Sequence, residues 1–105
     1  MQTARASTEC AAKLKVLGDP TRMRVIEVLM DGPRCVHELM SILKIEQSLL
    51  SHHLRVMRDA ELVEGVRAGK AVRYQLASGT AMHAPVIDIG CCQIVFDAKK
   101  GARKR

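Results

Sequence analysis

Two adjacent cysteines, Cys91 and Cys92, offer the clearest potential for chemistry in this sequence. Neighbouring thiolates chelate a trivalent arsenical or another soft metal ion when the backbone bends enough for both sulfurs to converge. Gly90 precedes the pair and permits such a bend. In a regular strand the two side chains would instead point to opposite faces, and one of them would pack inward. A third thiol is available from Cys10 or Cys35, in the same chain or in a second subunit.

Oxidation of these thiols is the competing interpretation. A nearby Lys or Arg stabilises the thiolate form of a cysteine and thereby favours its oxidation. A stable disulfide framework is not expected, because the chain is predicted to be cytoplasmic and cytoplasmic thiols are kept reduced. Residues 1–9 lack the apolar run of a secretory signal, and no stretch approaches the roughly 20 apolar residues that cross a membrane.

The charge of the chain indicates a polyanionic partner. Seventeen Lys and Arg residues against eleven Asp and Glu residues give a net charge of +6 and a pI near 9.5. A domain this basic favours DNA or RNA, although a solvated basic surface without a partner would have the same composition. The 105 residues fit one compact domain with an aliphatic core, since Trp is absent and Tyr74 and Phe96 stand alone of their types.

Four helices are expected in the first 60 residues. The second begins at Asp19-Pro20, because Asp is a favourable N-cap and Pro suits the first helical position. Gly18 ends the helix before it. The expected helices cover residues 7–18, 20–30, 35–43 and 47–60, so Cys35 and His37 fall on the third. Their apolar stripes follow the helical period and comprise Ala11, Leu14 and Leu17, then Val25, Ile26, Leu29 and Met30, then Val36, Leu39, Met40 and Leu43, and finally Leu50, Leu54 and Met57.

Residues 62–76 change to an alternating period that predicts a β-hairpin. Strands are expected over 62–66 and 71–76, joined by a turn at 67–70 in which Gly69 is free to adopt positive φ. Beyond the hairpin, Gly and Pro residues argue against a long helix over 78–90, and residues 86–96 are rich in β-formers. The charged segment 99–105 is predicted to be a disordered tail on a domain of residues 1–98.

The third and fourth helices, joined by a tight turn, describe a helix-turn-helix whose second helix can enter the major groove. Leu50 and Leu54 would face inward. Gln can bond adenine, Arg can bond guanine or phosphate, and small Ser residues allow close approach. The predicted DNA contacts on this helix are Gln47, Ser48, Ser51, His52 and Arg55. The predicted phosphate contacts on the hairpin are Arg67, Lys70 and Arg73.

Over residues 8–77 the chain resembles the ArsR/SmtB family of bacterial repressors. The motifs that carry the resemblance are Leu17-Gly18-Asp19-Pro20-Thr21-Arg22, Cys35-Val36-His37-Glu38-Leu39, Gln47-Ser48-Leu49-Leu50-Ser51-His52-His53-Leu54, Arg58-Asp59-Ala60-Glu61-Leu62-Val63 and Gly69-Lys70-Ala71-Val72-Arg73-Tyr74-Gln75-Leu76. The resemblance implies a mainly α fold with a β-hairpin wing: a winged helix-turn-helix homodimer that blocks transcription at palindromic double-stranded operator DNA until an inducer weakens binding.

The sequence departs from the family pattern at several places. Lys44 and Glu46 replace the Gly and Ser usual around the turn, which predicts a weaker cap on the fourth helix. Glu61 stands where a Gly is common, and a left-handed Glu there would cost about 1 kcal/mol. The family's final dimerisation helix is not evident, so the C-terminal half of the interface is left open.

The resemblance also bears on the inducer. Related metalloregulators carry Cys-Val-Cys where this chain has Cys35 and His37, and a further Cys can occur at Met40. Residues two apart on a helix diverge by roughly 200°, so Cys35 and His37 would share an ion only after distortion. A buried, inert Cys35 is the simpler interpretation. Arsenite-responsive members use vicinal cysteines near the C-terminus. His83 and Asp88 could bind zinc as in relatives, or could simply be solvated.

These observations predict a non-enzymatic repressor released from its operator by a thiol-reactive inducer, such as arsenite or another soft metal ion. The candidate inducer ligands are Cys91, Cys92, Cys35 and Cys10. A repressor that senses redox signals or reactive sulfur is the first alternative. A winged-helix module that binds protein without operator recognition is the second. An enzyme is not expected, because the sequence has no phosphate loop, carboxylate pair or nucleophile with an evident base.

Overall fold

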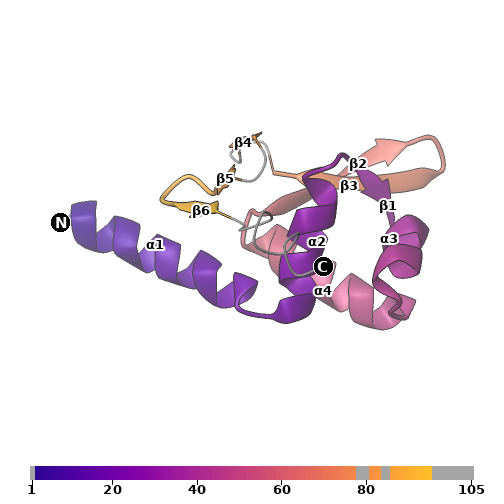
Figure 1. Cartoon of the computed structure of the whole chain (residues 1–105), viewed down its shortest axis with the longest axis horizontal. Helices are drawn as coiled ribbons and strands as arrows, with labels where there is room; N and C mark the ends of the chain where they lie inside the picture. Colours follow the sequence, from indigo (N-terminus) through magenta and orange to yellow (C-terminus); the bar gives the residue numbers. More distant parts are fainter. Residues whose placement is uncertain (1, 78–80, 84–85, 96–105) are drawn as a thin grey trace, which may run out of the picture.

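The computed structural model describes the backbone of residues 2–77, 81–83 and 86–95, and the side chains of residues 8–77 and 86–95. In chain order the helices are α1 (Gln2–Leu17), α2 (Pro20–Leu29), α3 (Val36–Leu43) and α4 (Gln47–Asp59). The strands are β1 (Arg34–Cys35), β2 (Val63–Ala68), β3 (Ala71–Leu76), β4 (Ala81–His83), β5 (Val86–Asp88) and β6 (Gln93–Val95). Figure 1 shows α1 as a long arm and the β2–β3 hairpin as a projecting wing.

The helix boundaries follow the expected signals. Asp19 caps α2, and its Oδ1 accepts hydrogen bonds from the backbone N–H of Thr21 at 2.8 Å and of Arg22 at 3.1 Å. Glu46 precedes α4 without a side-chain capping bond, so the prediction of a weaker cap there is confirmed. Lys44 and Glu61 adopt left-handed backbones with φ of 58° and 63°. α1 begins earlier than expected, at Gln2, and ends at Leu17 before Gly18.

The core lies between α2, α3, α4 and the two small sheets. The predicted stripes of α2, α3 and α4 all face the core. Their fully buried members are Val25, Ile26, Leu29, Leu39, Leu43, Leu50, Leu54 and Met57. Met30, Val36 and Met40 are partly buried and pack against this core. The stripe predicted for α1 is wrong in part. Leu17 is buried, but Leu14 is 44% exposed and Ala11 is exposed. Only the end of α1 joins the core, through Leu17 and the partly buried Val16, while most of the helix extends away from the other helices as an arm (Figure 1).

One three-stranded antiparallel sheet has the order β1-β3-β2. Its wing is longer than predicted, because β2 continues to Ala68 and pairs there with Ala71. Only Gly69 and Lys70 remain in the turn, with Gly69 at a φ of 66°, which fits a two-residue hairpin with Gly first. The strand β1 was not predicted; two residues are too short to show an alternating pattern.

A second antiparallel sheet, in the order β4-β5-β6, follows the wing. The expected strand over 86–96 is therefore two strands, β5 and β6, separated by a turn at residues 89–92. Ile87 and Ile89 fix this sheet to the core, being 0% and 1% exposed. Across the described part of residues 78–95 the chain forms strands and not a helix. The predicted tail at 99–105 and the domain limit at 98 lie outside the described residues.

Candidate nucleic-acid interface and cysteine cluster

The outer face of α4 carries the five polar residues predicted to read DNA. All five of these side chains are exposed: Gln47, Ser48, Ser51, His52 and Arg55. Their spacing places them along one side of a helix with 3.6 residues per turn. The opposite side is buried and comprises Leu50, His53, Leu54 and Met57. The packing of this second set holds α4 on the body of the domain with its polar side free.

The turn before α4 sets its angle to α3. Lys44 adopts the left-handed conformation, and its backbone N–H donates to the Met40 carbonyl at 2.7 Å, which ends α3. Three residues after Lys44, α4 begins at Gln47. Two short helices joined in this way, the second with a free polar side, are the geometry of a helix-turn-helix.

The wing presents three exposed basic residues, Arg67, Lys70 and Arg73. Arg67 is directly opposite Val72, and Arg73 is directly opposite Val66. Since successive side chains of a strand alternate between faces, Arg67 and Arg73 lie on opposite faces of the wing. Lys70 lies at the tip. All three side chains are therefore exposed, but the structure does not bring them onto one surface.

The buried face of α4 contains a polar contact that the sequence prediction missed. His53 is only 7% exposed, and its Nδ1 accepts a hydrogen bond from Nε of Arg22 at 3.0 Å. Desolvation is the main cause that lowers the pKa of His53; Arg22 and His52 add to this and Asp19 opposes it. Because Nδ1 accepts the bond from Arg22, it carries no proton in this arrangement, which places the ring proton on Nε2. The position of His53, three residues after Leu50, was the available signal, because it places the ring on the apolar stripe.

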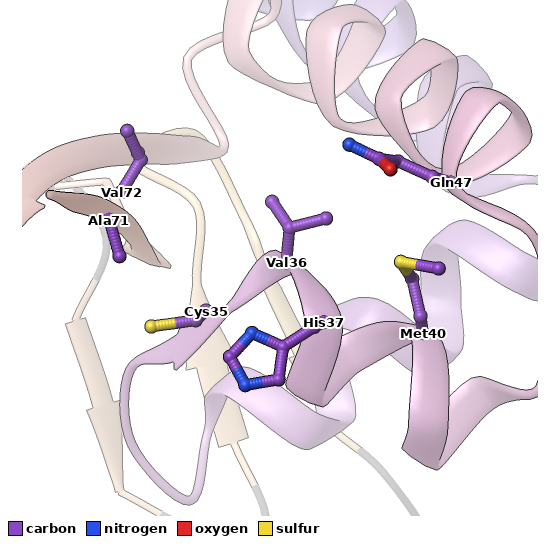
Figure 2. A pocket seen from close by; sticks show the side chains of 7 residues that line it. All are labelled: Cys35, Val36, His37, Met40, Gln47, Ala71 and Val72. Carbon is purple, nitrogen blue, oxygen red and sulfur yellow. The ribbon is translucent and has the colours of Figure 1, made fainter.

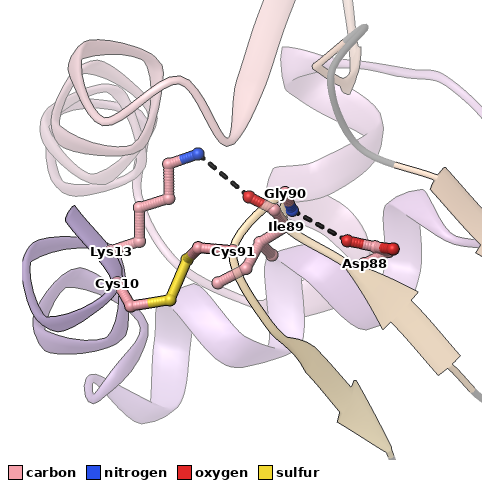
Figure 3. Close-up of a disulfide and its surroundings, with 6 residues drawn as sticks. All are labelled: Cys10, Lys13, Asp88, Ile89, Gly90 and Cys91. Carbon is pink, nitrogen blue, oxygen red and sulfur yellow. Dashed lines mark hydrogen bonds between the residues drawn. A yellow bond between two sulfur atoms is a disulfide. The ribbon is translucent and has the colours of Figure 1, made fainter. Parts of the chain in front are cut away.

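A cluster of three cysteines joins the two ends of the described chain. The sulfurs of Cys10 on α1 and of Cys91 and Cys92 after β5 all lie within 4.8 Å of one another. Cys10 and Cys91 form a disulfide with a Cα–Cα distance of 5.7 Å, drawn in Figure 3. The expectation that no disulfide would form is thus wrong for this pair. That expectation came from the compartment, whereas the fold brings the two sulfurs together. Cys92 remains a free thiol, half-buried.

The turn between β5 and β6 makes the two adjacent cysteines converge. Gly90 adopts a φ of 97°, as the sequence predicted, and its N–H donates to Asp88 Oδ1 at 2.8 Å. Ile89 N–H donates to the Cys92 carbonyl at 3.0 Å and closes the turn. Lys13 Nζ donates to the Ile89 carbonyl at 3.0 Å and links α1 to the same turn (Figure 3). Cys91 and Cys92 are therefore not strand residues, and the objection that their side chains diverge does not apply.

Cys35 lies in a different part of the molecule. It belongs to β1 and is the N-cap of α3, so the prediction that it lies within the third helix is wrong. It lines a pocket of about 250 Å³. The other lining residues are Val36, His37, Met40, Gln47, Ala71 and Val72. In Figure 2 Cys35 and Met40 lie on opposite sides of Val36. Among the described residues, Cys35 joins no cluster of three ligands.

The pair His83 and Asp88 is only half described. The backbone of His83 pairs with Val86 in the β4–β5 ladder, and its side chain lies outside the described residues. Asp88 accepts hydrogen bonds from the Gly90 N–H at 2.8 Å and from Gln93 Nε2 at 3.5 Å. The Asp88 carboxylate therefore holds the turn that carries the cysteines, a role that its sequence position did not indicate.

Among the described residues, no helix is long and apolar enough to span a membrane.

Comparison with known proteins places these features in a family. Residues 19–65 match the model of the "Bacterial regulatory protein, arsR family". The chain is 39% identical over 70 residues to the HTH-type transcriptional repressor SmtB of Mycobacterium tuberculosis, covering 67% of this chain and 52% of that protein. It is 37% identical over 68 residues to the arsenical resistance operon repressor of Staphylococcus xylosus, covering 65% of each. It thus spans between half and two thirds of these relatives.

The reduced form of HlyU from Vibrio cholerae has a similar structure, with a TM-score of 0.69 and 31% identity over 73% of this chain and 81% of that one. The expected fold, four helices with a β-hairpin wing, is confirmed. The prediction that the chain is not an enzyme agrees with relatives that are named as transcriptional repressors. On its sequence, its fold and these relatives, the chain belongs to the ArsR/SmtB family of winged helix-turn-helix proteins.

Proposed function

We propose that the protein is a DNA-binding transcriptional repressor that acts as a homodimer. The observation that carries this proposal is the division of α4 into a buried apolar side and an exposed polar side of Gln47, Ser48, Ser51, His52 and Arg55. The exposed side would contact base edges in the major groove. Its family relatives named as repressors support the same function.

The wing supplies the second part of the interface. Arg67 and Lys70 would contact phosphates beside the groove that α4 occupies, and Arg73, on the other face, would reach the backbone only where the duplex curves around the wing. The basic net charge of +6 favours such contacts. Two copies of α4 would enter major grooves about 34 Å apart. Exposed apolar side chains at Leu14 and Val95 support a second copy that covers α1 and β6.

Operator binding is tested by fluorescence anisotropy with the DNA upstream of the protein's own gene and with a shuffled duplex of the same length. We expect a strong preference for the native duplex and an affinity that falls steeply with salt. Equal affinity for both duplexes would support the alternative, an interaction module without operator recognition.

For the inducer, we propose that Cys10, Cys91 and Cys92 bind one trivalent metalloid or soft metal ion. Three sulfurs within 4.8 Å of one another support a three-coordinate site in one chain, once the Cys10–Cys91 bond has been reduced. With arsenous acid, three thiols would form three As–S bonds and release three waters. A relative that is named as an arsenical resistance repressor supports the same class of ligand. Cys35, the fourth candidate ligand, belongs to no such group of sulfurs among the described residues, and we leave it out of the proposed site.

The disulfide itself favours a second candidate, a repressor that senses oxidants. Peroxide would oxidise the thiols of Cys10 and Cys91 to the disulfide and would itself be reduced to two waters. A neighbour solved in a form described as reduced is in line with such a role. Operator release by arsenite under reducing conditions would support the metalloid site. Release by peroxide alone, reversed by dithiothreitol, would support the redox switch.

A further inference from the structure

Arg22 connects α1, which carries Cys10 of the cysteine cluster, to α4, the proposed recognition helix. Its Nε donates to His53 on the buried side of α4, and its Nη1 donates to the Val16 carbonyl at 3.2 Å. Val16 lies in the last turn of α1, where carbonyls have no partner within the helix. One guanidinium therefore holds the end of α1 and the back of the proposed recognition helix at the same time. Asp19 Oδ1 accepts a hydrogen bond from the backbone N–H of Arg22 at 3.1 Å, which fixes the backbone of Arg22 in the first turn of α2.

The other end of this connection is the cysteine cluster. Cys10 and Lys13 lie on the same helix as Val16 and attach it to the β5–β6 turn. Six residues separate Cys10 from Val16, which is about 9 Å along a helix axis. A helix this short between two anchors transmits a shift or rotation with little bending. A change in bonding at the sulfurs therefore reaches the Val16 carbonyl.

From this geometry we infer that Arg22 is the positioning residue that couples the cysteine cluster to α4. When the state of the sulfurs moves α1, the Val16 carbonyl moves with it, and Arg22 has to shift or to release one of its two acceptors. Because His53 is buried among the side chains that seat α4, a changed Arg22–His53 bond alters the angle of the exposed polar side. The link to operator release rests on the function proposed above; the link to His53 does not.

The first test follows the His53 ring in the full-length protein without DNA. Long-range ¹H–¹⁵N spectra would be recorded for the reduced, the disulfide and the arsenite-treated states, with the exposed ring of His37 on α3 as an internal reference. We expect the Nδ1 signal of His53 to move in at least one altered state by more than either His37 nitrogen. An unchanged His53 signal in both altered states would overturn the inference, and this measurement needs no substitution.

The second test measures coupling through operator affinity. Arg22→Lys keeps the charge but has one donor nitrogen in place of a guanidinium, so it cannot serve both acceptors in the same way. We expect the ratio of Kd with arsenite to Kd without it to fall roughly tenfold in this variant. Since the readout is a ratio, a change in basal affinity cancels. Arg24→Lys, an exposed change on the same helix, should keep the wild-type ratio. A full ratio in Arg22→Lys would overturn the inference.

The Arg22 coupling and the proposed release mechanism can fail separately. If His53 responds but arsenite and oxidation leave operator binding unchanged, the coupling stands and the proposed release mechanism fails. If the operator is released while His53 stays unchanged, the repressor function stands and Arg22 is not the coupling residue.

Discussion

Cys10 and Cys91 are separated by 81 positions in the sequence, yet they are covalently joined, and the free thiol of Cys92 lies within 4.8 Å of both sulfurs. The two proposed chemistries of these three atoms would exclude each other. A disulfide leaves one thiol, whereas a three-coordinate metalloid needs three. Under the proposed function, the oxidation state of the protein would therefore decide whether the metalloid can bind.

The first prediction concerns this competition. Reduced protein should take up one arsenite per chain, and the disulfide form should take up far less. Cys10→Ser should weaken binding by about tenfold or more, equal to about 1.4 kcal/mol, because one As–S bond is lost. Near-ultraviolet absorption of the As–S bonds measures uptake. Cys35→Ser is the control and should bind as the wild type does. If Cys10→Ser binds arsenite as tightly as the wild type, α1 supplies no ligand to the arsenite site.

The second prediction concerns the proposed reading face. Arg55→Ala should lower operator affinity by about 1–3 kcal/mol, because Arg55 is an exposed cation on the polar side of α4 and would contact a base or a phosphate. Anisotropy at a fixed salt concentration measures this loss. Arg24→Ala removes the same charge from an exposed position on α2 and should have a much smaller effect. If both variants lose affinity equally, the effect is one of net charge.

The third prediction follows from His53. Its pKa in the folded protein is below the ordinary 6.5, mainly through desolvation. Between the lowered folded value and 6.5, the unfolded chain binds more protons than the folded one, so the free energy of unfolding rises with pH in that window. The contribution is present above 6.5 and is lost as the pH falls through the folded value. Urea unfolding from pH 7.5 downward should show this loss in the wild type.

His53→Gln serves as the matched variant for that titration. It removes the titrating group while retaining an amide that can bond Arg22, so the fall in stability below pH 6.5 should be smaller than in the wild type. The exposed rings of His37 and His52 are retained in both proteins. Parallel pH profiles for the two proteins would show that His53 does not titrate differently on folding.

The fourth prediction tests the left-handed residues. Glu61 has a φ of 63°, a conformation that costs a residue with a Cβ about 1 kcal/mol. Glu61→Gly should therefore raise the free energy of unfolding by about 0.5 kcal/mol, after the larger entropy of the unfolded glycine chain is subtracted. Glu27→Gly, at an exposed position within α2, should lower it by up to about 1 kcal/mol. A loss of stability in both variants would mean that the Glu61 side chain makes a stabilising contact.

The sequence predicted the elements whose signals are local. The Asp19-Pro20 start, the apolar stripes of α2 to α4 and the Gly69 turn all depend on residues within a few positions of one another. The exposed polar side of α4 followed from the same stripe. Leu14 shows the limit of this reasoning, because periodicity identifies an apolar face but not whether another element of the same chain covers it.

The features that the sequence did not predict join distant segments. The Cys10–Cys91 bond depends on where the β5–β6 turn meets α1, and the Arg22–His53 bond on how α2 crosses α4. No local pattern encodes such a meeting. The predicted cytoplasmic location argued against any disulfide between the cysteines. The vicinal pair after a glycine was nevertheless sufficient to identify two of the three members of the cluster.

The Cys10–Cys91 bond also changes the topology of the chain. Every residue of α2, α3, α4 and the wing lies between the two bonded positions, so the disulfide closes all of these elements into one covalent ring. Closing a loop of this length restricts the unfolded chain by an amount worth about 4 to 5 kcal/mol. Reduction of the Cys10–Cys91 bond should thus lower the melting temperature of α2, α3, α4 and the wing together. The oxidation state of two sulfurs thereby affects the free energy of unfolding of every element inside the ring.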